Sequence, residues 1–146
     1  VLKDGTLIVT KIDDKKYVGK DILYVNVWKK NDKHMIYNLA YINIKNKYTY
    51  VKRFAATSVI LDKPYNIAGK NPDNKILYFT ANPNSESEVV NIFLHHTSKA
   101  RKKEFVYDFH SGHSGQPGKY RHGSYRTGRH GLCQCSRIND AGGHQF

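Results

Sequence analysis

The stretch that decides the fold is MIYNLAYINIKNKYTYVKRF, residues 35–54. It holds two runs rich in β-branched and aromatic residues, Met35–Ile44 and Tyr48–Phe54, with the polar segment Asn43–Lys47 at their junction. Runs of this composition around a short polar turn are typical of consecutive antiparallel strands. Neither run shows the sustained apolar repeat of an amphipathic helix, so both are predicted to be strands.

Further runs of the same kind lie on both sides of this stretch. They are Thr6–Ile12, Asp21–Trp28, Lys75–Thr80 and Val89–Leu94. Side chains in the second run alternate, with Ile22, Tyr24, Asn26 and Trp28 on one face and Leu23, Val25 and Val27 on the other. The residues between runs favour turns, at Asn31-Asp32, Pro64, Gly69–Asn74 and Asn82–Ser85. The pattern predicts an all-β fold of antiparallel meanders, as in sandwiches, barrels or propeller blades.

The composition narrows the class of partner. The chain has 146 residues, enough for one domain or part of one, and a net charge of +12 from 24 Lys and Arg against 12 Asp and Glu. Such an excess favours a polyanion, with nucleic acid first and an anionic membrane surface second. No apolar run approaches the roughly 20 residues that span a bilayer. Two cysteines indicate a reducing compartment without a disulfide framework.

The chain divides into two unlike parts at residue 109. Residues 1–109 carry the strand runs, whereas residues 110–146 have only Leu132 and Ile138 as branched aliphatics and hold eight of the 11 glycines. So little apolar surface cannot offset the entropy of ordering a backbone. We therefore expect an irregular tail over 110–146, loosely held or disordered.

Basic residues concentrate at the ends of the predicted strands and in the turns. Taken singly, each fits a solvated turn, but lysines on successive turns of a meander would lie along one rim that can follow a phosphate backbone. An arginine in such a rim could grip a phosphate with two hydrogen bonds. The predicted DNA-binding residues are Lys15, Lys16, Lys20, Lys29, Lys30, Lys45, Lys47, Lys52, Arg53 and Lys63.

Residues 1–109 show no catalytic constellation. The chain has no Gly-rich phosphate loop, dinucleotide fingerprint or nucleophile elbow. Glu86 and Glu88 share one face of a predicted strand, and we interpret them as a solvated hairpin edge in preference to a metal or acid–base pair. The run Arg101–Lys103 is interpreted as exposed charge. We therefore predict no catalytic, metal or cofactor site here.

Several motifs, in order, resemble the C-terminal region of the A subunit of bacterial type IIA topoisomerases, topoisomerase IV and gyrase. The resemblance covers residues 1–109. Its motifs are Asp4-Gly5-Thr6-Leu7, Lys16-Tyr17-Val18-Gly19-Lys20-Asp21-Ile22, Val27-Trp28-Lys29-Lys30, Tyr50-Val51-Lys52-Arg53-Phe54, Asp62-Lys63-Pro64-Tyr65 and Leu77–Asn84 with Glu86, Glu88, Val89 and Val90.

The resemblance implies a partial β-pinwheel of about two four-stranded, propeller-like blades in residues 1–109. Its basic rim would bind and bend double-stranded DNA and so support ATP-dependent strand passage by the whole enzyme. The partners implied are DNA, an ATPase B subunit, which completes the enzyme, and the rest of the A subunit, in the bacterial cytoplasm at the nucleoid. The Mg²⁺ and ATP sites of the parent enzyme would lie outside this chain.

Three departures from the family pattern stand out. Leu61 occupies a position where the resemblance leads us to expect an arginine, which removes one phosphate contact. Ser85 replaces an expected glycine, which predicts a less tight turn. The chain lacks the glycine-rich basic box of gyrase, which favours a parent of the topoisomerase IV kind.

The tail allows three interpretations. Cys133 and Cys135, with His130 and His144, offer four zinc ligands, although one intervening residue is shorter than the usual cysteine spacing. The second interpretation is a disordered basic tail. The third is a frameshift, because Gln116–His122 can be encoded so that reading one base later gives Ser-Gln-Gly-Asn-Ile-Val-Thr, close to the strand expected next. Sequencing the encoding DNA tests the frameshift.

Two functions of other classes compete with DNA binding. One is a β-propeller-like module that binds an acidic protein, which would show little salt-dependent affinity for DNA. The other is a zinc-dependent hydrolase built on the tail, which would require stoichiometric metal.

Overall fold

The computed structural model describes residues 1–45, 48–94, 96, 101–110, 113–114, 124–125 and 133–137. These residues form an all-β structure without an α-helix, as predicted. The elements are β1 (Thr6–Leu7), β2 (Ile36–Asn43), β3 (Tyr48–Phe54), β4 (Tyr65–Asn66), β5 (Lys75–Asn82), the 3-10 turn η1 (Pro83–Ser85), β6 (Val89–Leu94), β7 (Glu104–Asp108), β8 (His113–Ser114), β9 (Ser124–Tyr125) and β10 (Cys133–Arg137).

The described strands make two four-stranded antiparallel sheets and one two-stranded sheet. The first sheet has the order β5-β2-β3-β9, the second β10-β6-β7-β8, and β1 pairs with β4. In the first sheet, β2 and β3 pair in register from Tyr37 with Phe54 to Asn43 with Tyr48. The hairpin predicted from residues 35–54 is therefore confirmed.

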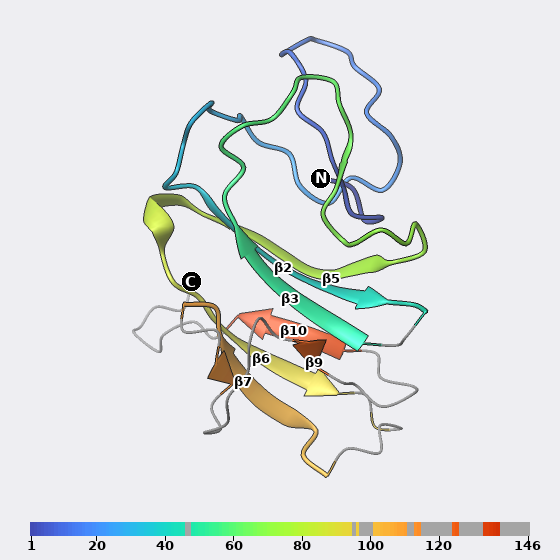
Figure 1. Cartoon of the computed structure of the whole chain (residues 1–146), viewed down its shortest axis with the longest axis vertical. Coiled ribbons are helices and arrows are strands. Elements are labelled where there is room, and N and C mark those ends of the chain that lie inside the picture. Colours follow the sequence, from blue (N-terminus) through green and yellow to red (C-terminus); the bar gives the residue numbers. More distant parts are fainter. Residues whose placement is uncertain are drawn as a thin grey trace, which may run out of the picture.

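The first sheet is covered on both faces, which explains why five successive residues of β2, from Tyr37 to Tyr41, are buried. On one face, Leu39 and Tyr41 pack with Ala68 from the segment after β4. On the other face, Val51, Leu77 and Tyr78 pack against the second sheet, where the buried residues are Val90, Ile92, Tyr107 and Phe109. In Figure 1 the long loops lie above the first sheet and β6 and β7 lie below it.

Two of the predicted strands were wrong. Only Thr6 and Leu7 of the run 6–12 are in a strand, and Ile22 makes a single bridge to Leu2 while the rest of 21–28 is irregular. No described segment lies beside these residues to complete a ladder, and Val25 remains 75% exposed. An alternating pattern makes an extended backbone favourable, but a strand also requires a partner for its N–H and C=O groups.

Strand β7 was not among the predicted runs. It follows directly on the basic run Arg101–Lys103 and spans five residues, so its sequence gives a weak signal. The strand is stabilised by the second sheet, because β7 pairs with β6 and Tyr107 is buried in the core with Val90 and Ile92.

Three short strands lie in the tail. β8 pairs with β7, β9 with β3 and β10 with β6, all antiparallel. The other tail residues after 110 lie outside the described residues. The division at residue 109, the disorder and the frameshift stay predictions.

Candidate nucleic-acid interface

Two loops, residues 8–35 and 55–64, carry most of the predicted DNA-binding lysines. Backbone hydrogen bonds tie the loops together, from Asp62 N to Val9 O at 2.7 Å and from Asn31 N to Thr57 O at 3.0 Å. The indole Nε1 of Trp28 donates to Ala56 O at 2.7 Å. The loops are therefore held in place by specific contacts, although they contain almost no strand.

Six predicted lysines are exposed on these loops, and we refer to them as the loop group. They are Lys15, Lys16, Lys20, Lys29, Lys30 and Lys63. The ammonium of Lys16 lies 2.5 Å from the Asp62 carboxylate, an ion pair that joins the two loops. The neighbouring Lys63 ammonium lies 5.6 Å from the centre of the Tyr65 ring. The structure thus brings Lys16 close to the segment that carries Lys63, although the two lysines are distant in the sequence.

A second basic group lies at the ends of two hairpins. Lys45 is exposed in the β2–β3 turn, and Arg101, Lys102 and Lys103 are exposed in the β6–β7 turn. Both β2 and β6 run away from the β5–β6 connection, so the two turns lie at the same end of their sheets (Figure 1). We call these four residues the tip group. Lys47 lies outside the described residues.

The two groups are separated by the length of a strand. The eight residues of β2 lie between Lys29-Lys30 and Lys45, which corresponds to about 25 Å at roughly 3.3 Å per residue. The structure therefore divides the predicted residues between the loops, the hairpin ends and the first sheet. The run Arg101–Lys103, interpreted from the sequence as plain exposed charge, lies at the same end of its sheet as Lys45 does of the first sheet.

Lys52 and Arg53, both on β3, are engaged within the molecule. The Lys52 ammonium donates to Ile67 O at 3.0 Å and lies 5.0 Å from the centre of the Tyr41 ring. Burial lowers the pKa of Lys52 from its ordinary value. The Arg53 Nη2 donates to the backbone oxygens of Ser85 at 3.1 Å and Glu86 at 3.4 Å. These cations are less available to phosphate than those of the loop group.

Glu88 is a functional group that the sequence interpretation missed. The predicted solvated edge was wrong for this residue, because Glu88 is 2% exposed whereas Glu86 is exposed. Its Oε2 accepts hydrogen bonds from Asn38 Nδ2 at 2.8 Å, Thr80 Oγ1 at 2.5 Å and Asn82 Nδ2 at 3.2 Å. Its Oε1 accepts one from the Tyr78 hydroxyl.

These donors keep the buried carboxylate charged. Burial by itself raises the pKa of Glu88, but the hydrogen bonds from Thr80, Tyr78, Asn38 and Asn82 favour the charged form and outweigh it. The net effect is a pKa below the ordinary value. The signal that could have revealed this site is the set of polar residues Asn38, Thr80 and Asn82 within otherwise apolar strand runs.

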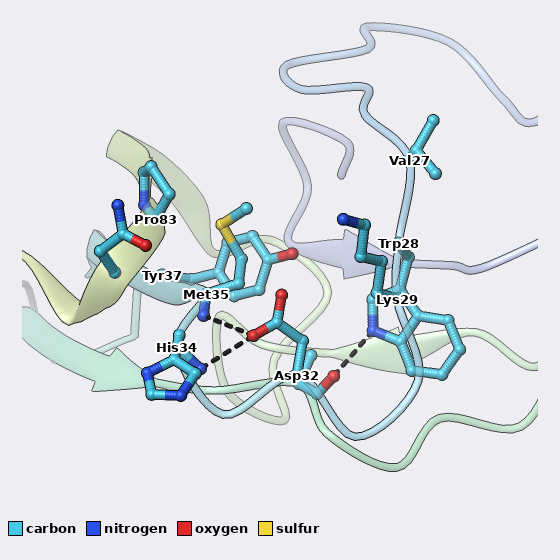
Figure 2. A pocket seen from close by; sticks show the side chains of 10 residues that line it. Val27, Trp28, Lys29, Asp32, His34, Met35, Tyr37 and Pro83 are labelled. Carbon is cyan, nitrogen blue, oxygen red and sulfur yellow. Dashed lines mark hydrogen bonds between the residues drawn. The ribbon is translucent and has the colours of Figure 1, made fainter.

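A cavity of about 220 Å³ lies where the first loop enters β2. Its wall includes Trp28, Met35, Tyr37 and Pro83, with Lys29 from the loop group beside them (Figure 2). Asp32 shapes this corner, because its Oδ1 accepts hydrogen bonds from the backbone N–H groups of His34 and Met35 (Figure 2). Lys29 thus lines the same cavity as Pro83 and Asn84 of the β5–β6 connection.

The zinc interpretation falls mostly outside the described residues. His130 and His144 are not among them, and only the backbone of Cys133 and Cys135 is described, in β10. Among the described residues, no group of three His, Cys, Asp or Glu side chains could hold a metal ion. The same residues include no helix long and apolar enough to cross a membrane.

Comparison with known proteins places this geometry in context. The family model described as the topoisomerase C-terminal domain of Bacteroidota matches residues 1–114. The chain is also 30% identical over 84 residues to the A subunit of DNA topoisomerase 4 from Borreliella burgdorferi. That alignment covers 57% of this chain and 13% of the relative, so the chain spans a small part of the relative's length. No solved structure matches the chain.

Proposed function

The chain belongs to the family of bacterial topoisomerase C-terminal domains, and we propose that it binds and bends double-stranded DNA for the A subunit of a type II topoisomerase. The loop and tip groups would contact phosphates, without reading the base sequence. Phosphate contacts of this kind position and deform a duplex. The chain itself would contribute no catalytic residue.

The observation that carries the proposal is the loop group. Six exposed lysines stand on two loops that an ion pair and several hydrogen bonds hold together. A surface that is ordered before binding loses less entropy when DNA arrives than a flexible basic tail would. The net charge of +12 adds long-range attraction toward a polyanion.

The architecture supports a pinwheel assignment. We propose that each four-stranded antiparallel sheet is one blade, so that residues 1–109 with the tail strands supply about two blades. The parent would be an A subunit that works with an ATPase B subunit in the bacterial cytoplasm. Magnesium and ATP would act at sites elsewhere in that enzyme. The missing glycine-rich basic box favours a topoisomerase IV parent over gyrase.

Exposed aliphatic residues favour one alternative. Val25 and Val27 are 75% and 65% exposed on an extended segment that has no strand partner among the described residues. Such a surface suits protein contact. A protein-interaction module is therefore the second candidate, and its natural partner would be the remainder of the parent enzyme.

A titration of the 146-residue chain with long duplex DNA at several salt concentrations tests the proposal. We expect the logarithm of the binding constant to fall linearly with the logarithm of salt concentration, because lysines displace counterions from phosphates. Duplexes of unrelated sequence should bind with similar affinity, and a metal chelator should change nothing.

Two outcomes would count against DNA binding. A folded chain that does not bind DNA even at low salt would leave the protein-interaction module as the better candidate. Binding that a chelator abolishes would instead support a metal-dependent function of the tail.

A further inference from the structure

The connection between β5 and β6, residues 83–88, joins the two four-stranded sheets. Its ends are anchored inside the protein, since Asn82 and Glu88 are both 2% exposed, while residues 83–87 are exposed. In Figure 1 this connection leaves the end of β5 and runs past the edge of the first sheet to β6. We refer to it as the connector.

Arg53 holds the middle of the connector from the first sheet. Its Nη2 donates to two successive carbonyl oxygens, Ser85 O and Glu86 O. Ser85 is also held from the other side, because its N–H donates to His34 O at 2.7 Å. The guanidinium is planar and has several N–H donors in fixed directions, so it can define the path of a backbone in a way that a lysine cannot.

The local backbone shows that the connector is kept in a demanding conformation. Asn84 has φ of 59° and Ser85 has φ of 57°, both in the left-handed region. A left-handed serine is strained, and the hydrogen bonds of its N–H and C=O offset this strain. The turn at the position of the missing glycine is therefore stabilised by contacts with His34 and Arg53.

Glu88 fixes the far end of the connector. Its carboxylate binds donors from β2, β5 and the end of β5 at Asn82, and its backbone O accepts the N–H of Phe109 at 2.9 Å. One residue therefore joins the first sheet to the segment that follows β7. Arg53 and Glu88 together fasten the connector at two points.

The burial of Arg53 argues against direct phosphate contact. Its Nη1 has no exposed surface and no hydrogen-bond partner among the described residues. A phosphate oxygen could therefore not reach the second nitrogen of the fork. Arg53, predicted from the sequence to grip DNA, is half-buried, with Nη1 covered and Nη2 bonded to backbone oxygens of the connector.

We propose that Arg53 is a positioning residue that sets the angle between the two sheets, and through it the curvature of bound DNA. The inference rests on the proposed DNA-binding function. The tip group supplies the link, because Lys45 stands on the first sheet and Arg101, Lys102 and Lys103 stand on the second. A duplex that touches both hairpin ends must follow the angle between the sheets, and the phosphate contacts offset the cost of bending it.

The angle can be measured on the protein without DNA. We would place one spin label on each hairpin end through Lys45→Cys and Lys102→Cys, after Cys133→Ser and Cys135→Ser remove the native thiols, and compare label distances. In the Arg53→Gln background we expect the distance distribution to shift and broaden. Arg53→Lys, which can donate to one carbonyl at a time, should lie between the two. Urea unfolding of each variant shows that the fold is kept.

A measurement with DNA then distinguishes whether Arg53 positions the sheets or contacts a phosphate. For Arg53→Gln we expect energy transfer between the labelled ends of a bound duplex to fall, while the salt dependence of binding is unchanged. The control Lys29→Gln should reduce the salt slope by about 0.9, because one phosphate contact is lost. It should leave the label distances and the energy transfer unchanged.

The possible failures are distinguishable. If Arg53→Gln reduces the salt slope as Lys29→Gln does and leaves the label distances unchanged, Arg53 contacts phosphate and the inference is wrong. If the unmodified chain does not bind DNA, the proposed function fails, and the label distances still decide whether Arg53 sets the angle. Unchanged distances in Arg53→Gln overturn the inference in either case.

Discussion

The hairpin β2–β3 and the loop 8–35 are similar in composition, but only the hairpin is paired in a sheet. Both contain β-branched and aromatic residues in strand-like runs, yet β2 is paired on both sides and the loop is almost unpaired. Leu39 of β2 is completely buried, whereas Ile12 of the loop is 90% exposed. Apolar content and alternation therefore favour an extended chain, and the presence of neighbouring strands decides whether it joins a sheet.

The same contrast separates two kinds of basic residue. Lys52 and Arg53 lie in the first sheet, where packing supplies carbonyl partners, and the loop group stands in water. A cation that loses part of its contact with water gains from internal acceptors, because an unpaired charge away from water is costly. The proposal consequently gives stability and DNA contact to different regions, which substitutions can test.

The largest expected effect comes from the same substitution in both regions. Ile92→Ala in the second sheet should lower the free energy of unfolding by about 3 kcal/mol, because the side chain is 2% exposed and its loss leaves a cavity. Ile12→Ala in the loop should change it by less than about 0.5 kcal/mol. Urea unfolding of the 146-residue chain measures both. Equal effects would show that the loop is packed in solution.

A matched pair of glutamates should give the next largest effect. Glu88→Gln removes a buried, hydrogen-bonded carboxylate and should cost about 2 kcal/mol near neutral pH, whereas Glu86→Gln should be nearly neutral. The folded pKa of Glu88 is lowered, so its contribution is complete above the unfolded value of about 4.3 and is lost as the pH falls through the folded pKa.

Urea midpoints at several pH values check this dependence. The difference between the native chain and Glu88→Gln should be constant from neutral pH to about pH 5 and should narrow in more acidic solution. A difference that widens in acid would mean that Glu88 is protonated in the folded protein.

A smaller effect is expected where the loops meet. Trp28→Phe keeps an aromatic side chain but removes the donor to Ala56 O, and should cost about 1 kcal/mol. Tyr17→Phe, at a side chain that is 81% exposed, is the control and should change stability little. Hydrogen exchange of the Asn31 amide, which donates to Thr57 O, should accelerate in the first variant only.

The smallest effect on stability should accompany a clear effect on DNA binding. Lys30→Gln should leave unfolding within about 0.5 kcal/mol of the native chain and reduce the salt slope by about 0.9. Lys52→Gln should show the reverse, because Lys52 donates to Ile67 O and packs on Tyr41. If Lys52→Gln reduced the salt dependence of DNA binding, Lys52 would be a phosphate contact after all.

Part of the candidate site could be predicted from the sequence. The exposure of the loop lysines was recognisable because turn positions expose long cationic side chains. The sequence could not reveal that Asp62 pairs with Lys16, or that the β2–β3 and β6–β7 turns lie at the same end of their sheets, because both depend on how distant segments are arranged. Glu88 was wrongly predicted to be solvated, because its hydrogen-bond partner Asn38 lies 50 residues away in the chain.

The sequence by itself determined the all-β class, the hairpin of residues 35–54 and the membership in the topoisomerase family. These follow from side-chain periodicity, turn chemistry and motif order, all of which are local. Only the tertiary structure decided which extended runs became strands and which cations face water. Strand pairing and burial are set by neighbours far away in the chain, and residues of one type, such as Lys52 and Lys29, differ in their contacts because of them.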